Sequence, residues 1–353
     1  MDPQIDWRWR VFRWIGESCF RDFHPTPMKA TPILHLVCSS FLVFPLLAAA
    51  AESLTPQSPV ELTGTHGKFD FIKIDSINHR LLACHTGNGS LDVIDTATCK
   101  LIKSVPTGNA QGVAIDAKGG RYFVSCSKPQ KMVIVDSTKL EVTGEVALSG
   151  PADLVAYHPD TNRVFVCNDE KPEMWIIDPE TKTITSTITF PGGGMEDLDF
   201  DKKGEFLFQC LKDSSQLAKL DPKSAKIVDI WSTSPAEKPH GLAMMASEDH
   251  ALIVAGNGKL GLFDLGSGKI ITTADIAQKV DEIAYDPGAQ RVYCASGLGT
   301  ISVVDLDHSK LTTQPLLPSS QGAHSIAVDP TTHTVWIAFA RDGLPFVQSF
   351  TTN

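Results

Sequence analysis

An apolar phrase that ends in aspartate recurs along this chain at nearly constant spacing. The first copy, LDVID, ends at Asp95, and the aspartate returns at Asp136, Asp178, Asp221, Asp264 and Asp305. The steps between these residues are 41, 42, 43, 43 and 41 positions. Self-similarity at such a period is typical of repeat architectures, in which each unit buries its apolar faces against its neighbours. The spacing therefore constrains the fold more strongly than any local propensity.

A second apolar phrase precedes each of these copies by 19 or 20 residues and raises the number of repeats to seven. The second phrases end at Asp75, Asp116, His158, Asp201, Met245, Asp286 and Asp329. Within a repeat, short alternating or apolar segments are separated by Gly, Pro, Asn and Asp, a pattern that indicates strands rather than helices. Four short strands in roughly 40 to 45 residues are typical of a propeller blade. The sequence thus predicts an all-β, seven-bladed β-propeller.

The recurring aspartates have a structural explanation in this fold. Each ends a strand, where a short acceptor side chain can hold the backbone N–H groups of the following turn. We therefore expect these residues to shape turns and not to take part in chemistry.

The last repeat contains only three strand-like segments, HSIAVD, TVWIAFA and PFVQSF. A spare strand-like stretch, PVELTGT at 59–65, lies before the first repeat. We expect this N-terminal strand to complete the seventh blade and close the ring, since closure removes the free sheet edge.

Residues 28–51 have the three-part plan of a secretory signal peptide. Lys29 provides a short basic start, an apolar stretch runs from Ile33 to Leu47, and small residues follow. The segment is too short and wrongly flanked for a membrane span, and cleavage is expected near Glu52. Residues 1–27 are interpreted as an upstream extension, or alternatively as an amphipathic surface segment. The sequence therefore predicts a periplasmic or secreted protein, with one propeller domain at 52–353 and no membrane span in the mature chain.

The charge balance argues against two classes of partner. The whole chain has a formal net charge of −10, and without residues 1–51, which hold five basic and four acidic side chains, 26 basic and 37 acidic residues remain. An acidic chain with no basic cluster is a poor match for nucleic acid or for anionic membranes.

Six cysteines lie after residue 51, and their positions favour free thiols over disulfides. Five take nearly the same second-strand position in different repeats, where Cys serves as a small buried hydrophobe: Cys84, Cys126, Cys167, Cys210 and Cys294. Cys99 lies in a turn, and neither a CxxC pair nor a haem-attachment run is present. A pair that came within reach would nevertheless be oxidised in the periplasm.

Two longer passages carry a family resemblance. The phrases GVAID…RYFVSCS…MVIVDSTKLEVTGEV and LVAYHPDTNRVFVCND…MWIIDPETKTITSTI resemble the YVTN-repeat, YncE-like β-propellers of exported bacterial proteins. The resemblance covers about residues 58–353, although the copies FLFQC, LIVAG and VWIAF depart from the YVTN tetrapeptide after which the family is named. It implies the fold and leaves the function open, because one fold hosts binding modules, surface-layer components and partners of redox enzymes.

The candidate site follows from the register of the innermost strands. Five positions before the end of each second phrase, a polar residue is expected at the mouth of the central channel. These residues, here called the mouth ring, are Asp70, Gln111, Asp153, Glu196, His240, Asp281 and His324. Two positions further on, every repeat has Ile, Val or Leu. The alternation predicts a polar mouth above an apolar layer.

The mouth ring supports two functional interpretations besides a simply hydrated entrance. We expect an exported propeller that binds a small ligand or a protein partner through its channel face. The alternative is a metal-assisted lyase or lactonase, in which His240, Asp281, His324 and Asp70 meet at one point, since imidazole and carboxylate together suit a divalent metal such as Zn, Mn or Fe. No organic cofactor is expected. Metal affinity should fall as the pH drops through about 6.5, because the imidazoles must be neutral.

Overall fold

The computed structural model describes residues 54–245 and 249–352. The expected upstream extension at 1–27, the signal peptide at 28–51 and the cleavage point near Glu52 lie outside the described residues. The described part belongs to one compact unit, Ala51–Asn353, and its secondary structure consists of strands and turns. Over this part of the chain, no helix is long and apolar enough to span a membrane.

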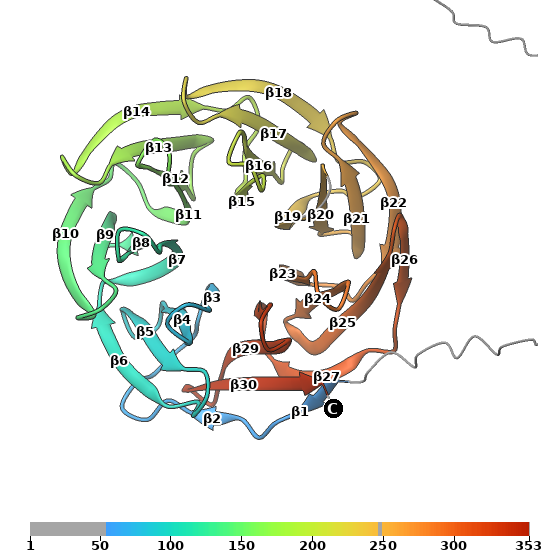
Figure 1. Cartoon of the computed structure of the whole chain (residues 1–353), viewed down its shortest axis with the longest axis horizontal. Helices are drawn as coiled ribbons and strands as arrows, with labels where there is room; N and C mark the ends of the chain where they lie inside the picture. The colour runs from blue at the N-terminus through green and yellow to red at the C-terminus, as the bar shows by residue number, and fades with distance from the viewer. Residues whose placement is uncertain (1–53, 246–248, 353) are drawn as a thin grey trace, which may run out of the picture. The chain divides into compact units, whose positions relative to one another are not determined.

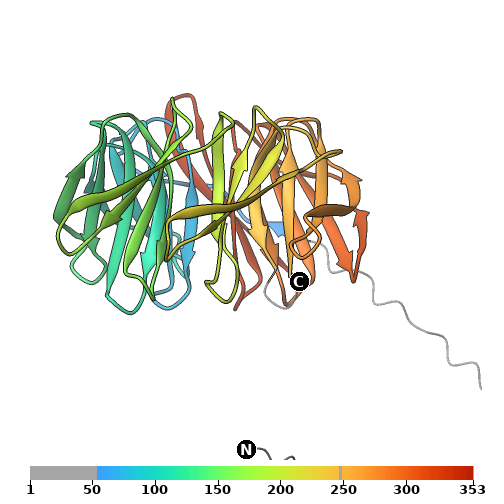
Figure 2. The ribbon, with the colours of Figure 1, turned by 90° about the horizontal axis from the view of Figure 1, so that it is seen from above.

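Seven antiparallel sheets stand in a ring around a central channel, and in six of them the strands follow chain order from the channel outward (Figure 1). The predicted all-β, seven-bladed propeller is therefore confirmed. Seen from the edge, the strands run across the thickness of the ring (Figure 2). The innermost strands are β3 (Ile72–Asp75), β7 (Asn109–Asp116), β11 (Ala152–His158), β15 (Met195–Phe200), β19 (Pro239–Met244), β23 (Val280–Asp286) and β28 (Ser325–Asp329).

Two further layers complete the regular part of each blade. The second strands are β4 (Arg80–His85), β8 (Arg121–Lys128), β12 (Arg163–Asn168), β16 (Leu207–Leu211), β20 (His250–Ala255), β24 (Arg291–Ser296) and β29 (Thr334–Arg341). The third strands are β5 (Ser90–Asp95), β9 (Lys131–Asp136), β13 (Glu173–Asp178), β17 (Gln216–Asp221), β21 (Lys259–Asp264), β25 (Leu298–Asp307) and β30 (Leu344–Thr352).

The outer strands vary more than the inner ones. Five blades have a single outer strand: β6 (Leu101–Pro106), β10 (Glu141–Ala147), β14 (Thr183–Thr189), β18 (Lys226–Ser232) and β22 (Lys269–Asp275). In the sixth blade, β26 (Lys310–Thr313) and β27 (Leu317–Gln321) both pair with β25. In the seventh, β1 (Leu54–Pro56) and β2 (Val60–Glu61) both pair with β30. The strand expected over 59–65 thus covers only Val60–Glu61.

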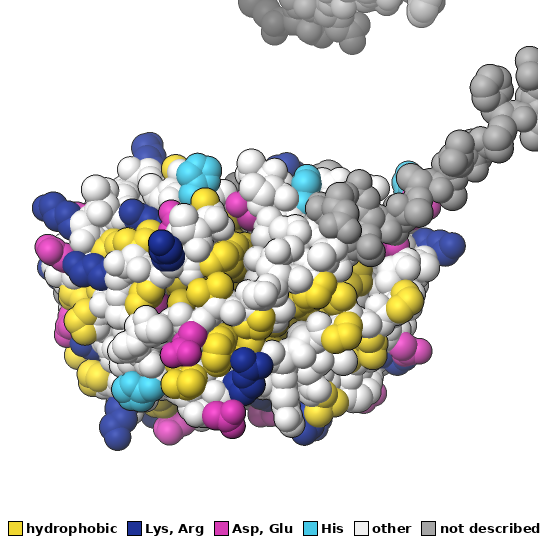
Figure 3. All heavy atoms as spheres, turned by 90° about the horizontal axis from the view of Figure 1, so that it is seen from below, with side chains coloured by type: hydrophobic (Ala, Val, Ile, Leu, Met, Phe, Trp, Pro, Cys, Tyr) yellow, Lys and Arg dark blue, Asp and Glu magenta, His cyan; other side chains and the backbone are white. Residues whose placement is uncertain are grey.

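The hydrophobic core is divided into seven clusters, one at each junction between neighbouring blades. Between the second and third blades, for example, Phe123 packs in the same cluster as Trp175, and both side chains are buried. Each blade therefore buries both faces against its neighbours, as the repeat predicts. The edge of the ring beside β1 and β2 shows apolar side chains interspersed with charged ones (Figure 3).

The strand-ending aspartates behave as predicted in most repeats. Asp136, for example, accepts hydrogen bonds from the backbone N–H groups of Thr138 (2.9 Å) and Lys139 (2.8 Å). These bonds lower the pKa of Asp136. Asp305 differs from the other aspartates, because β25 continues to Asp307 and the turn comes later. Its carboxylate accepts a hydrogen bond from Nε of Arg291 at 2.7 Å.

The cysteine prediction is also confirmed for the described residues. Cys84, Cys126, Cys167, Cys210 and Cys294 are free and buried on second strands, and Cys99 is free and partly exposed. The two remaining cysteines, Cys19 and Cys38, lie outside the described part.

Candidate functional site: the mouth of the channel

The mouth ring lies where the innermost strands begin, at one end of the channel. In five blades the pairing with the second strand is interrupted at this point by a β-bulge, located between Ala110 and Gly112, Ala152 and Val155, Met195 and Leu198, Pro239 and Leu242, and Val280 and Ile283. A bulge bends its strand and redirects a side chain, and bulges are frequent beside functional sites. Each of these five bulges contains the residue that belongs to the mouth ring.

These residues enclose a polar pocket of about 250 Å³, here called the mouth pocket. It is lined by six of the seven mouth-ring residues, Asp70, Gln111, Asp153, Glu196, His240 and Asp281, together with Leu154, Asp169, Lys212 and Glu282. The seventh, His324, places Nδ1 at 3.2 Å from Oδ2 of Asp281. The apolar layer expected below the ring is also present, and Ile72, Val113 and Leu242, for example, are each at most 4% exposed.

His240 occupies the centre of an acidic cluster. Its Nδ1 lies 3.3 Å from Oδ1 of Asp281 and 3.4 Å from Oε2 of Glu196. This nitrogen is buried, and its two contacts are those of an ion pair and not of a well-formed hydrogen bond. On the other side, Oε1 of Glu196 pairs with Nζ of Lys212.

Three of these residues present donor atoms to a common point. One atom each from Glu196, His240 and Asp281 lies within 4.8 Å of the other two, and this is the only such group found among the described residues. This group shares His240 and Asp281 with the set expected from the sequence. Glu196 completes the group, whereas His324 faces the second oxygen of Asp281 and Asp70 is not a member.

The electrostatics of the cluster follow from these contacts. The carboxylates of Asp281 and Glu196 raise the pKa of His240 to about 9, and Asp281 also raises the pKa of His324. Burial alone would raise the pKa of Asp281, but the two imidazoles outweigh it and lower that pKa. The pH window expected for metal binding therefore moves upward, because a proton on His240 must be displaced at any pH below about 9.

Two other carboxyl groups of the mouth ring lack such compensation. Burial raises the pKa of Asp70 to about 6, with His324 opposing the shift. Burial, followed by the neighbouring charges of Asp70 and Glu196, raises the pKa of Asp153. The pocket thus gathers carboxyl groups in a partly desolvated space, where a bound cation would stabilise their ionised forms.

The sequence analysis missed three polar residues of the mouth pocket. Asp169 and Lys212 directly follow the second strands β12 and β16, which run antiparallel to the innermost strands and so end where those begin. The position after each second strand is therefore a signal that could have found them. Glu282 was missed because strict alternation points it away from the channel, whereas the bulge at Val280 and Ile283 brings two consecutive side chains to the pocket.

Comparisons with known proteins agree with the fold and with the resemblance in the repeats. Uncharacterized protein YncE of Salmonella typhi is 25% identical over 174 residues, which is 46% of this chain and 47% of that protein. Protein NirF of Stutzerimonas stutzeri is 23% identical over 126 residues, or 35% of this chain and 31% of that protein. The chain is a seven-bladed β-propeller whose sequence is similar to parts of YncE and NirF. It spans about half the length of the YncE proteins that it matches and about a third of NirF.

No family model matches the chain. Among solved structures, a chain of Kuenenia stuttgartiensis Hydrazine Synthase is similar, with a TM-score of 0.69 and 14% identity. The superposition covers 82% of this chain and 98% of the other. At this identity the likeness describes the shared propeller fold and carries no argument about chemistry.

Proposed function

We propose that this protein is an exported binding module that holds a divalent transition-metal ion at the mouth of its channel. The observation that carries the proposal is the buried Nδ1 of His240, which lies between two carboxylates without a well-formed hydrogen bond. A metal ion could take the place of the imidazole proton at this point and would then be held by His240, Glu196 and Asp281 together. Export belongs to the proposal through the leader at 28–51.

The donor set fits a transition metal better than a hard cation. One imidazole with two carboxylates suits Zn²⁺, Mn²⁺ or Fe²⁺, whereas Mg²⁺ and Ca²⁺ favour oxygen ligands alone. A pocket of about 250 Å³ accommodates an ion or a small ligand. A protein partner would reach it with a single side chain.

Titration calorimetry on the purified protein, after removal of metal by a chelator, tests the proposal. We expect one Zn²⁺ or Mn²⁺ ion per chain, with binding at least tenfold weaker in the double variant Glu196→Gln/Asp281→Asn. The matched control is Glu145→Gln/Asp275→Asn, which changes the same charges in exposed ion pairs on outer strands. Absence of stoichiometric binding, or equal binding by both double variants, would refute the metal site.

An enzyme is the second candidate, and one observation favours it. Only three protein donors converge at the mouth among the described residues, which would leave a coordination position open. Catalytic zinc sites keep such a position for water or substrate, as a lyase or lactonase would require. Turnover of a lactone by the metal-loaded protein that is lost in Glu196→Gln/Asp281→Asn would support this function, and turnover unaffected by that variant would exclude it.

A further inference from the structure

A second cavity lies inside the channel, beneath the mouth pocket. This channel cavity has a volume of about 330 Å³ and is lined mainly by apolar side chains of the innermost strands. Leu154 and Glu282 line both spaces, so the two are adjacent. Ser76 and Pro330 also line the cavity and directly follow the ends of β3 and β28, so the cavity extends toward the face opposite the mouth. A volume of this size is in the range of pockets for small molecules.

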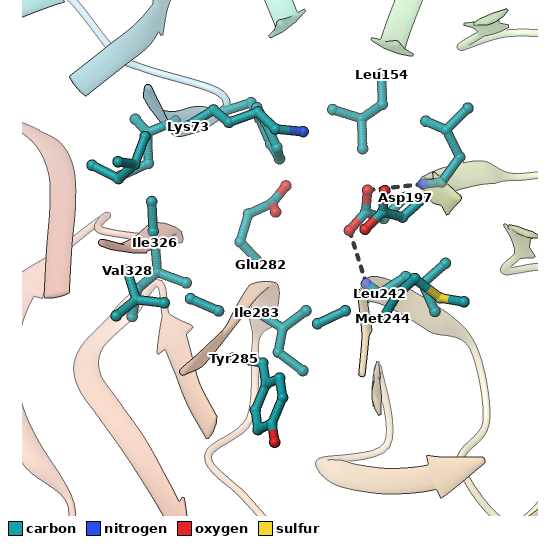
Figure 4. A pocket seen from close by; sticks show the side chains of 18 of the residues that line it. Lys73, Leu154, Asp197, Leu242, Met244, Glu282, Ile283, Tyr285, Ile326 and Val328 are labelled. Carbon is teal, nitrogen blue, oxygen red and sulfur yellow. Dashed lines mark hydrogen bonds between the residues drawn. The ribbon is translucent and has the colours of Figure 1, made fainter. Parts of the chain in front are cut away.

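Four titratable side chains line the channel cavity, three of them acidic and one basic. They are Lys73, Asp197, Asp199 and Glu282. Figure 4 shows the Lys73 ammonium group and the Glu282 carboxyl group both projecting into the space. In the described part of the chain, Lys73 forms no ion pair. One basic group therefore faces three acidic ones across apolar walls.

The acidic groups differ in how well they are satisfied. Asp197 accepts hydrogen bonds from the backbone N–H groups of Leu198 and Leu242, both at 2.8 Å, so each of its oxygens has a partner (Figure 4). Asp199 accepts one from the N–H of Phe200 at 2.8 Å. The side chain of Glu282, in contrast, is 8% exposed and has no hydrogen-bond or ion-pair partner among the described residues. A buried carboxyl group of this kind is costly unless something else satisfies it.

We propose that the channel cavity binds a small organic molecule that carries a protonated amine on an apolar body, with the ammonium group at Glu282. The apolar lining receives the body, and the unpartnered carboxyl group receives the charge. A metal ion is disfavoured because the cavity offers neither His nor Cys, and a hard dication would need about six oxygen ligands where only Glu282 is free of backbone bonds. This site is distinct from the metal site at the mouth.

Benzylamine is a suitable probe, with benzyl alcohol and benzoate as its neutral and anionic counterparts. We expect saturable binding of benzylamine by calorimetry and markedly weaker binding of the other two. Glu282→Gln should weaken benzylamine binding at least tenfold, because a charge-assisted contact is lost. Lys73→Met should strengthen it severalfold, because a like charge is removed. Glu141→Gln, an exposed change on β10, is the matched control and should have no effect.

Several outcomes would overturn the proposal. They are equal binding of benzyl alcohol, tighter binding of benzoate, no binding of benzylamine, or unchanged affinity in Glu282→Gln. If Glu282→Gln does not fold, Lys73→Met serves as the test variant. An unchanged affinity of Lys73→Met for benzylamine would then contradict the proposal. The mouth variant Glu196→Gln/Asp281→Asn should lose Zn²⁺ but retain benzylamine. Loss of benzylamine in that variant would place the amine at the mouth and refute the interior site, whereas failure of Zn²⁺ binding alone would leave it standing.

Discussion

Acidic residues stand at both ends of the innermost strands, but the two ends use them differently. At the strand ends, Asp75 accepts hydrogen bonds from the backbone and side chain of Asn78 and from the hydroxyl group of Tyr122 in the next blade. At the strand starts, Asp281 and Glu196 face imidazoles and each other across the mouth pocket. Residue type alone therefore does not distinguish a structural acidic residue from a functional one. The contacts of the side chain make this distinction, because at the strand ends they are with a turn and the neighbouring blade, whereas at the strand starts the side chains line an open pocket.

The contrast predicts opposite effects of substitution, and the largest is at a strand end. Asp75→Ala leaves the buried Tyr122 hydroxyl without its 2.6 Å acceptor and removes the bonds to Asn78. We expect the free energy of unfolding to fall by about 3 kcal/mol. Denaturant titration measures the change, and Asp75→Asn, which keeps an acceptor, should lose less. A denaturation midpoint equal to that of the parent would show that this end is not structural.

The next effect concerns pH and the imidazole at the mouth. His240 has a pKa of about 9 in the folded protein and about 6.5 when unfolded. Because the folded state binds this proton more tightly, its contribution to stability is complete below pH 6.5 and is lost as the pH rises through about 9.

In metal-free protein we expect this contribution to be about 2 to 3 kcal/mol. Denaturant titrations at pH 6 and pH 9 measure it, with His240→Gln as the comparison. The variant should lose less stability over this interval than the parent does. Equal losses would mean that the imidazole is not held between the two carboxylates.

The smallest effect is a gain of stability at a strand start. The pKa of Asp153 is raised by burial and by neighbouring acids, so its ionised form opposes folding near neutral pH. Asp153→Asn keeps the shape without the charge and should stabilise the protein by about 1 kcal/mol at pH 7. The gain should shrink near pH 4, where the carboxyl group of the folded parent is already protonated. A loss of stability at pH 7 would indicate that Asp153 has a structural partner after all.

The repeat made most of the fold predictable, and the reason is its register. Once the spacing set seven blades, a fixed offset from Asp75, Asp116 and their counterparts located the whole mouth ring. The offset could not show that Glu196, and not Asp70, joins His240 and Asp281, because that choice depends on rotamers across the channel. Nor could it place Glu282, since a bulge adds a residue that alternation does not anticipate.

The five buried thiols make the order in which the blades unfold measurable. Each lies on the second strand of a different blade, and burial raises the pKa of every one of them. A buried neutral thiol does not react with an alkylating reagent, so a cysteine becomes labelled only after its own blade has opened. A short pulse of reagent, followed by peptide mass analysis, would therefore record the order in which Cys84, Cys126, Cys167, Cys210 and Cys294 become accessible. The natural sequence thus contains a set of blade-specific reporters of local unfolding, with no engineered label required.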